Sequence, residues 1–80
     1  MDKNNNQYKT SDFGLAASLC ASDVGLVGIN KDNPRRAIFI FNDSDLTSDV
    51  IDSYRSGTLM VNAIRYFETT KRLKSQLYGD

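Results

Sequence analysis

Two neighbouring arginines, Arg35 and Arg36, stand directly before the apolar run 37–41. Cationic side chains that bind phosphates supply most of the affinity of proteins for nucleic acid. A second cationic group comes from the C-terminal third of the chain and comprises Arg65, Lys71, Arg72 and Lys74. We expect these six side chains to contact nucleic acid or a nucleoprotein complex. For the C-terminal group, the structural alternative is a solvated helix face on which Glu68 pairs with Lys71 and Arg72.

An acidic block occupies the middle of the chain and consists of Asp43, Asp45, Asp49 and Asp52. Ten Lys and Arg residues balance ten Asp and Glu residues, so the net charge is zero and the charges separate into two poles. Such a molecule suits head-to-tail contacts or contacts with two partners. The alternative function is therefore that of an inhibitor, adaptor, subunit or anti-defence protein that binds a protein partner. Its candidate contacts are Asp45, Asp49, Asp52 and Tyr54, with Tyr66 and Tyr78 as further anchors for a partner or a homodimer.

The residues of most catalytic and metal sites are missing from the sequence. There is no histidine, and Cys20 is the single cysteine, which excludes zinc sites, serine triads and Cys–His pairs. Asp43 and Asp45 have a spacing found in calcium loops, but the glycine and the bidentate glutamate of such a loop are absent. Cys20 lies in an apolar segment, where an inert buried thiol is expected. We expect no enzyme activity, metal or cofactor.

The length of 80 residues allows one small domain, here 7–80 after a polar leader over residues 1–6 that is expected to be disordered. A single cysteine and the lack of a long apolar run predict a soluble protein of a reducing cytoplasm, without membrane contact. Apolar periodicity predicts strands at 7–10, 24–29 and 36–41 and helices at 11–22, 45–56 and after Asn62. The expected fold is α+β, a three-stranded antiparallel sheet packed by helices in the order β-α-β-β-α-α.

Alternation along the third strand places Phe39 and Phe41 on one face and Ile38 and Ile40 on the other. The run is apolar enough to predict burial on both faces. Two aromatic residues in this pattern also occur in base-stacking sheets, but a core position for both phenylalanines is the favoured interpretation.

Capping residues mark the ends of the expected helices. Residues 31–34, ending in Pro34, are expected to form a turn. The expected first helix begins at Thr10 or Ser11 and ends near Gly25, the second runs from Ser44 to Gly57, and Asn62 caps the third. The apolar side of this third helix is expected to consist of Ala63, Ile64, Phe67, Thr70, Leu77 and Tyr78.

Four segments are spread over most of the chain: Thr10-x-Asp12-Phe13-x-Leu15-Ala16, Asn33-Pro34-Arg35-Arg36-x-x-Phe39-x-Phe41, Gly57-x-Leu59-x-Val61-Asn62-Ala63-x-x-Tyr66-Phe67 and Leu73-Lys74-Ser75-x-Leu77-Tyr78. With these segments the chain resembles a family of small single-domain proteins of unknown function from bacteria and their phages. The resemblance covers residues 7–78, and its most specific parts are the Asn33–Arg36 turn and the ending 73–78 (Leu-Lys-Ser-Gln-Leu-Tyr). It implies a phage or mobile-element setting but no activity, cofactor or site residue. Asn62 stands where the family is expected to have Asp, and either residue caps a helix.

Overall fold

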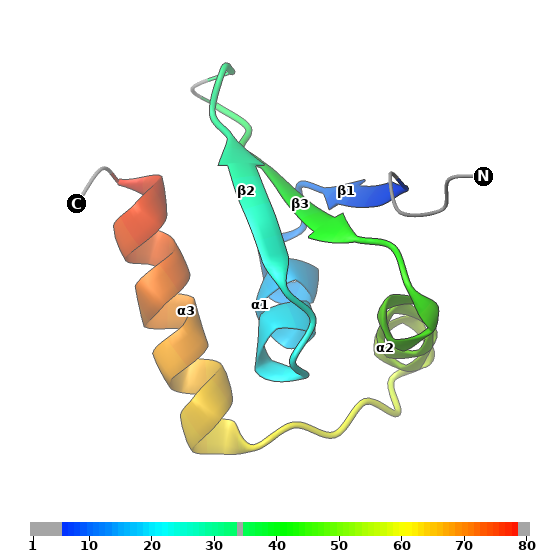
Figure 1. The fold of residues 1–80 in the computed structure, drawn as a ribbon. Helices are drawn as coiled ribbons and strands as arrows, with labels where there is room; N and C mark the ends of the chain where they lie inside the picture. The colour runs from blue at the N-terminus through cyan, green and yellow to red at the C-terminus, as the bar shows by residue number, and fades with distance from the viewer. Residues whose placement is uncertain (1–5, 34, 79–80) are drawn as a thin grey trace.

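The computed structural model describes residues 6–33 and 35–78. Residues 1–5 of the predicted leader, and Pro34 of the predicted turn, lie outside the described residues. The chain has the predicted α+β order β-α-β-β-α-α (Figure 1). The elements are β1 (Gln7–Thr10), α1 (Phe13–Ala21), β2 (Leu26–Asn30), β3 (Ile38–Asn42), α2 (Asp45–Ser56) and α3 (Ala63–Leu77).

The three strands form one antiparallel sheet in the order β1-β3-β2. The most apolar strand, β3, therefore takes the middle position, where both of its backbone edges are paired. Phe41 stands opposite Tyr8 on one side and opposite Leu26 on the other. The pairing of β2 with β3 shifts register between Leu26 and Gly28, which is the effect of one extra residue in β2.

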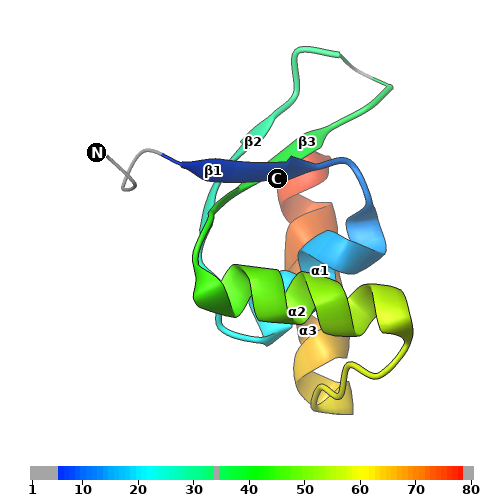
Figure 2. The ribbon, with the colours of Figure 1, turned by 90° about the vertical axis from the view of Figure 1, so that its right-hand side faces the viewer.

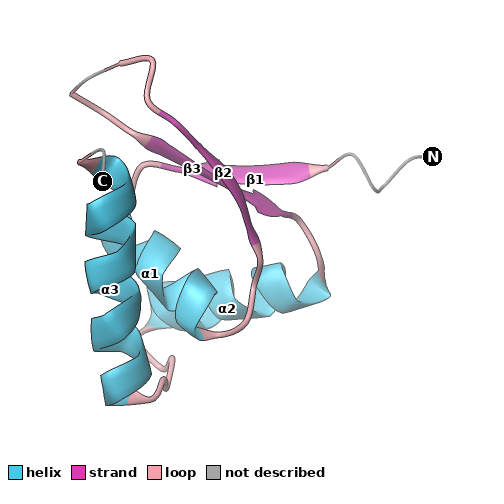
Figure 3. Cartoon of the chain, turned by 60° about the vertical axis from the view of Figure 1, so that its left-hand side comes forward, coloured by secondary structure: helices cyan, strands magenta, loops and turns pink. Residues whose placement is uncertain are grey.

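The three helices lie to one side of the sheet (Figure 3). Phe39 and Phe41 point to that side and are buried in the core, which confirms the predicted core role and leaves neither ring free to stack on a base. The predicted burial of both faces is wrong for the second face, where Ile38 and Ile40 are only partly buried. No described helix covers them, because all three pack on the phenylalanine side.

Helix α1 is the centre of the helical layer and lies between α2 and α3 (Figure 2). Its small residues make this close packing possible, since Ala16 and Ala17 are completely buried and Leu15 and Leu19 fill the space around them. The resulting core combines α1 with Phe39 and Phe41, with Val50 and Ile51 of α2, and with Leu73 of α3.

The ends of α1 differ from the prediction. Asp12 is the N-cap, and its carboxylate accepts a hydrogen bond from the Leu15 amide, while the Thr10 hydroxyl accepts one from the Asp12 amide. The Asp12 carboxylate, one position after Ser11, reaches the free amides of the first turn. It also lies at the positive end of the helix dipole. The helix ends before Gly25, because Asp23 adopts the left-handed conformation with φ 71°.

Both ends of α2 confirm the prediction, with Ser44 as N-cap and Gly57 as left-handed C-cap. Because Gly57 has φ 78°, a Cβ there is strained even though no atom lies within 4 Å of it. Gly57→Ala is expected to lower the melting temperature by about 4–8 °C, which corresponds to about 1 kcal/mol for a domain of this size. Thermal unfolding followed by circular dichroism measures the shift. The control is Gly25→Ala, which has equally open surroundings and no positive φ and should change the melting temperature little; equal losses would contradict the backbone explanation.

Candidate nucleic-acid interface

The described residues of the loop between β2 and β3, 31–33 and 35–37, lie at the C-terminal end of α3. The Lys31 ammonium donates a hydrogen bond of 2.8 Å to the Gln76 carbonyl. The last turn of a helix carries unsatisfied carbonyls and a partial negative charge, so this contact fixes the loop to the helix. The contact brings the predicted Arg35 and Arg36 to the same end of the molecule as the last turn of α3.

Asn33 gives the loop its shape. Its side-chain oxygen accepts a hydrogen bond of 2.9 Å from the Arg35 amide, and its carbonyl accepts one of 3.0 Å from the Arg36 amide. Local bonds of this kind are the reason that asparagine favours turns. Both arginine side chains are exposed.

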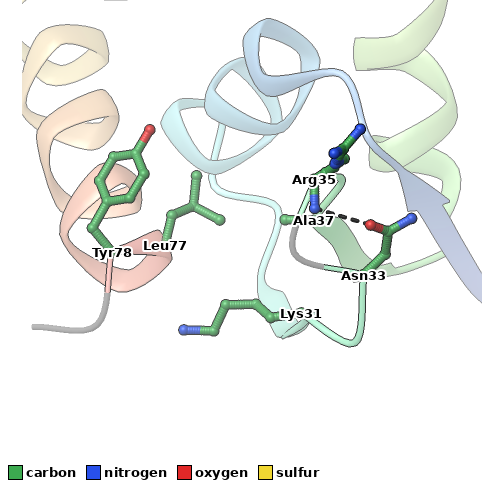
Figure 4. Close-up of a pocket in the computed structure, with 6 residues that line it drawn as sticks. All are labelled: Lys31, Asn33, Arg35, Ala37, Leu77 and Tyr78. Atoms are coloured by element: carbon green, nitrogen blue, oxygen red, sulfur yellow. Dashed lines mark hydrogen bonds between the residues drawn. The ribbon is translucent and has the colours of Figure 1, made fainter.

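A pocket of about 420 Å³ opens between this loop and α3 (Figure 4). Tyr78 and Leu77 form its helical wall, and Figure 4 shows the side chains of Lys31 and Arg35 extending in different directions from the loop. Two cations that diverge do not enclose a single anion. They suit the successive phosphates of an extended chain. The full lining is Lys31, Asn33, Arg35, Ala37, Leu77 and Tyr78.

The cations of α3 separate onto two flanks of the helix. Arg65 pairs with Asp23, which follows α1, and Arg72 lies close enough to Cys20 to influence its thiol. Lys71 and Lys74 lie on the other flank, beside aromatic rings. The Lys71 ammonium is 5.3 Å from the centroid of Phe67. The predicted cationic group therefore does not form one continuous surface.

Lys74 lies one turn before Tyr78 on α3 and does not line the pocket itself. Its ammonium lies 6.0 Å from the centroid of the Phe13 ring at the start of α1. Tyr78 follows one turn later and is 78% exposed. We use the term cationic end for the surface made by Lys31, Arg35, Arg36, Lys74 and Tyr78.

The predicted apolar side of α3 is wrong. Ile64 and Phe67, which were expected to face the core, are 71% and 61% exposed, whereas Leu73 is buried. The helix is rotated so that Tyr66, Thr69, Leu73 and Leu77 face α1 and the sheet, since these positions share one side at helical spacing. The sequence contains two apolar rows on this helix, and the structure buries the row centred on Leu73.

The predicted acidic contacts lie on α2, away from the cationic end. Asp45, Asp49 and Asp52 are exposed on its outer side, at a spacing that places them on one face. Tyr54 lies on the inner side, packs against the core and donates to the Asp12 carboxylate at 3.4 Å. Partial burial and the nearby Asp12 carboxylate raise the pKa of Tyr54.

Cys20 is half-buried beside the core. Burial raises the pKa of its thiol, and the positive charge of Arg72 opposes that shift. A raised pKa reduces the fraction of reactive thiolate, so the environment of Cys20 does not favour nucleophilic chemistry.

Lys31 belongs to the cationic end but was not among the predicted site residues. Its partner Gln76 is 45 positions away in the chain, and neither residue has a local pattern that points to the other. Tyr78 was expected only as an anchor for a protein or homodimer partner, and in the structure it lines the same pocket as Arg35.

The chain is a small α+β domain, and comparison with family models shows the family to which it belongs. A family model described as a domain of unknown function (DUF5659) matches residues 5–79, and the chain belongs to that family. Searches of curated proteins and of solved structures gave no match. Across residues 6–33 and 35–78, no helix has the length and apolar character needed to cross a membrane. The same residues contain no group of three or more side chains suited to hold a metal ion.

Proposed function

We propose that this domain is a non-enzymatic module that binds single-stranded nucleic acid, or a nucleoprotein that exposes it, through the cationic end. The observation that carries the proposal is the pocket that Lys31 and Arg35 line together with Tyr78. Proteins that bind single strands combine a cationic track along the phosphates with aromatic rings on which bases stack. Here the cations come from a loop and the exposed ring comes from a helix end.

The charge distribution supports binding of the strand at the cationic end. The acidic face of α2 repels phosphates, so the strand approaches only the cationic end although the net charge is zero. The phage or mobile-element setting implied by the resemblance, and a reducing cytoplasm, belong to this proposal. A second candidate, contact with a protein partner as an inhibitor or adaptor, is favoured by the exposed aspartates of α2.

Loss of the two loop cations tests the proposal directly. The double variant Lys31→Ala/Arg35→Ala is expected to bind a labelled single-stranded oligonucleotide about tenfold more weakly. Because each lost phosphate contact removes about 0.7 from the slope of log K against log salt, the slope should become less steep by about 1.4. Fluorescence anisotropy at several salt concentrations measures both quantities.

A variant with the same net charge separates position from charge. Arg55→Ala/Arg65→Ala also removes two cations, but Arg65 lies at the opposite end of α3 and Arg55 on α2. It should change the affinity less than about twofold, because remote charges are screened within about 10 Å. Equal weakening by both double variants, or no binding of the wild-type protein at low salt, would contradict the proposed site.

A further inference from the structure

Helix α3 carries an exposed apolar row that no described part of the chain covers. Ile64 and Phe67 lie three positions apart, and Lys71 continues the row one turn later. Met60, just before the helix, is also largely exposed. Phe67 and Ile64 are large side chains on the solvent side of a helix whose inner side is already occupied by Leu73. This row is therefore a surface without an internal role in the fold.

The outer side of α2 carries a row with the opposite charge and a similar length. Leu46 is 46% exposed, and Asp49 and Asp52 follow it at intervals of three residues. Each row begins with an apolar side chain and ends with a charged one. The charge is positive on α3 and negative on α2.

The two rows have matching lengths. From Ile64 to Lys71 the helix rises about 10 Å, and from Leu46 to Asp52 about 9 Å, at 1.5 Å per residue. If the two helices lie side by side and parallel, Leu46 meets Ile64 where Asp52 meets Lys71. The same alignment places Asp49 beside Phe67, whose ring already carries the Lys71 ammonium on its face.

The rows cannot meet within one molecule, because α2 and α3 lie on opposite sides of α1 (Figure 2). We propose that copies of this chain associate head to tail, with the α3 row of one copy seated on the α2 row of the next. The two surfaces in such a contact differ, so each added copy leaves one row of each kind free. Contacts of this type generate rings when the rotation closes and open filaments when it does not. The inference does not depend on the proposed binding of nucleic acid.

A charge exchange between the two rows gives a direct test. In Lys71→Glu both rows are acidic, and in Asp49→Lys/Asp52→Lys both rows are basic, so each variant alone should associate at least about fivefold more weakly than the wild-type protein. When the two variants are mixed, every contact between unlike copies pairs opposite charges, and association should return. Sedimentation velocity without nucleic acid, from about 10 μM to 1 mM, covers the range of weak interfaces.

Two further variants complete the test. Phe67→Ser should weaken association about tenfold by removing the aromatic contact, while Lys9→Glu, on β1, has the same change of charge as Lys71→Glu and should leave it unchanged. A wild-type protein that stays monomeric throughout this range overturns the inference. So does association that is lost in Phe67→Ser but unaffected by the α2 reversals, since that result indicates a symmetric contact between two α3 helices.

Discussion

Replacement of Phe41 by alanine is expected to lower the free energy of unfolding by about 3–5 kcal/mol, the usual cost of emptying a buried phenylalanine site. Phe41 has no exposed surface, stands in the middle strand and contacts the core formed by all three helices. A chain of 80 residues has a total stability of about 4–12 kcal/mol. The loss is therefore about a quarter or more of the total stability, and a wild-type protein at the low end of this range would leave the variant largely unfolded without denaturant.

Urea titration followed by circular dichroism measures this loss against a neighbour in the same strand. Ile40→Ala removes three carbon atoms, against six in Phe41→Ala, and it removes them from the opposite, partly exposed face of β3. It should cost less than half as much as Phe41→Ala, because less apolar surface leaves the interior. Similar losses for the two variants would show that both faces of the sheet are covered.

Leu73→Ala is expected to cost about 2–5 kcal/mol and to release α3 from the rest of the domain. Leu73 is the large apolar side chain of α3 that reaches the core, while Tyr66 and Leu77 contact it from partly buried positions. An isolated helix of 15 residues is marginal in water. Loss of this contact should therefore leave the segment 63–77 largely unfolded even where the sheet persists.

Hydrogen exchange measures the release of α3, since its amides should lose protection before those of β3. Phe67→Ala is the matched control on the same helix and should change the stability by less than about 0.5 kcal/mol, because the ring is mostly exposed. If Phe67→Ala proves the more damaging of the two, the rotation of α3 described above is wrong.

Helix α2 and the order of the elements could be predicted from the sequence because their signals are local. Ser44 caps the first turn of α2, Gly57 supplies the left-handed residue at its end, and both act within a few residues of their position. The alternation in β3 fixed the direction of Phe39 and Phe41 for the same reason. The position of Asp12 as the cap of α1 was missed, because Thr10, Ser11 and Asp12 all offer a suitable oxygen.

The rotation of α3 could not be predicted, because its sequence has two apolar rows of similar strength. Helical periodicity shows that a row exists but does not indicate which of two rows is buried. The small residues of α1 admit the side carrying Leu73, and that choice is a property of the packed molecule. The arginines of the cationic end were predicted from composition, whereas Lys31 and its contact with Gln76 required the fold.

The sheet order β1-β3-β2 has a consequence for synthesis on the ribosome. The strand that holds the other two is the last of the three to be made, so β1 and α1 leave the exit tunnel before any strand exists to receive them. Once Asn42 has emerged, β2 and β3 can close as a local hairpin, and β1 must then pair with a strand from which 27 residues of chain, 11–37, separate it. Until that step the nascent amino terminus displays unpaired backbone, and a chaperone that captures extended segments would find its substrate there.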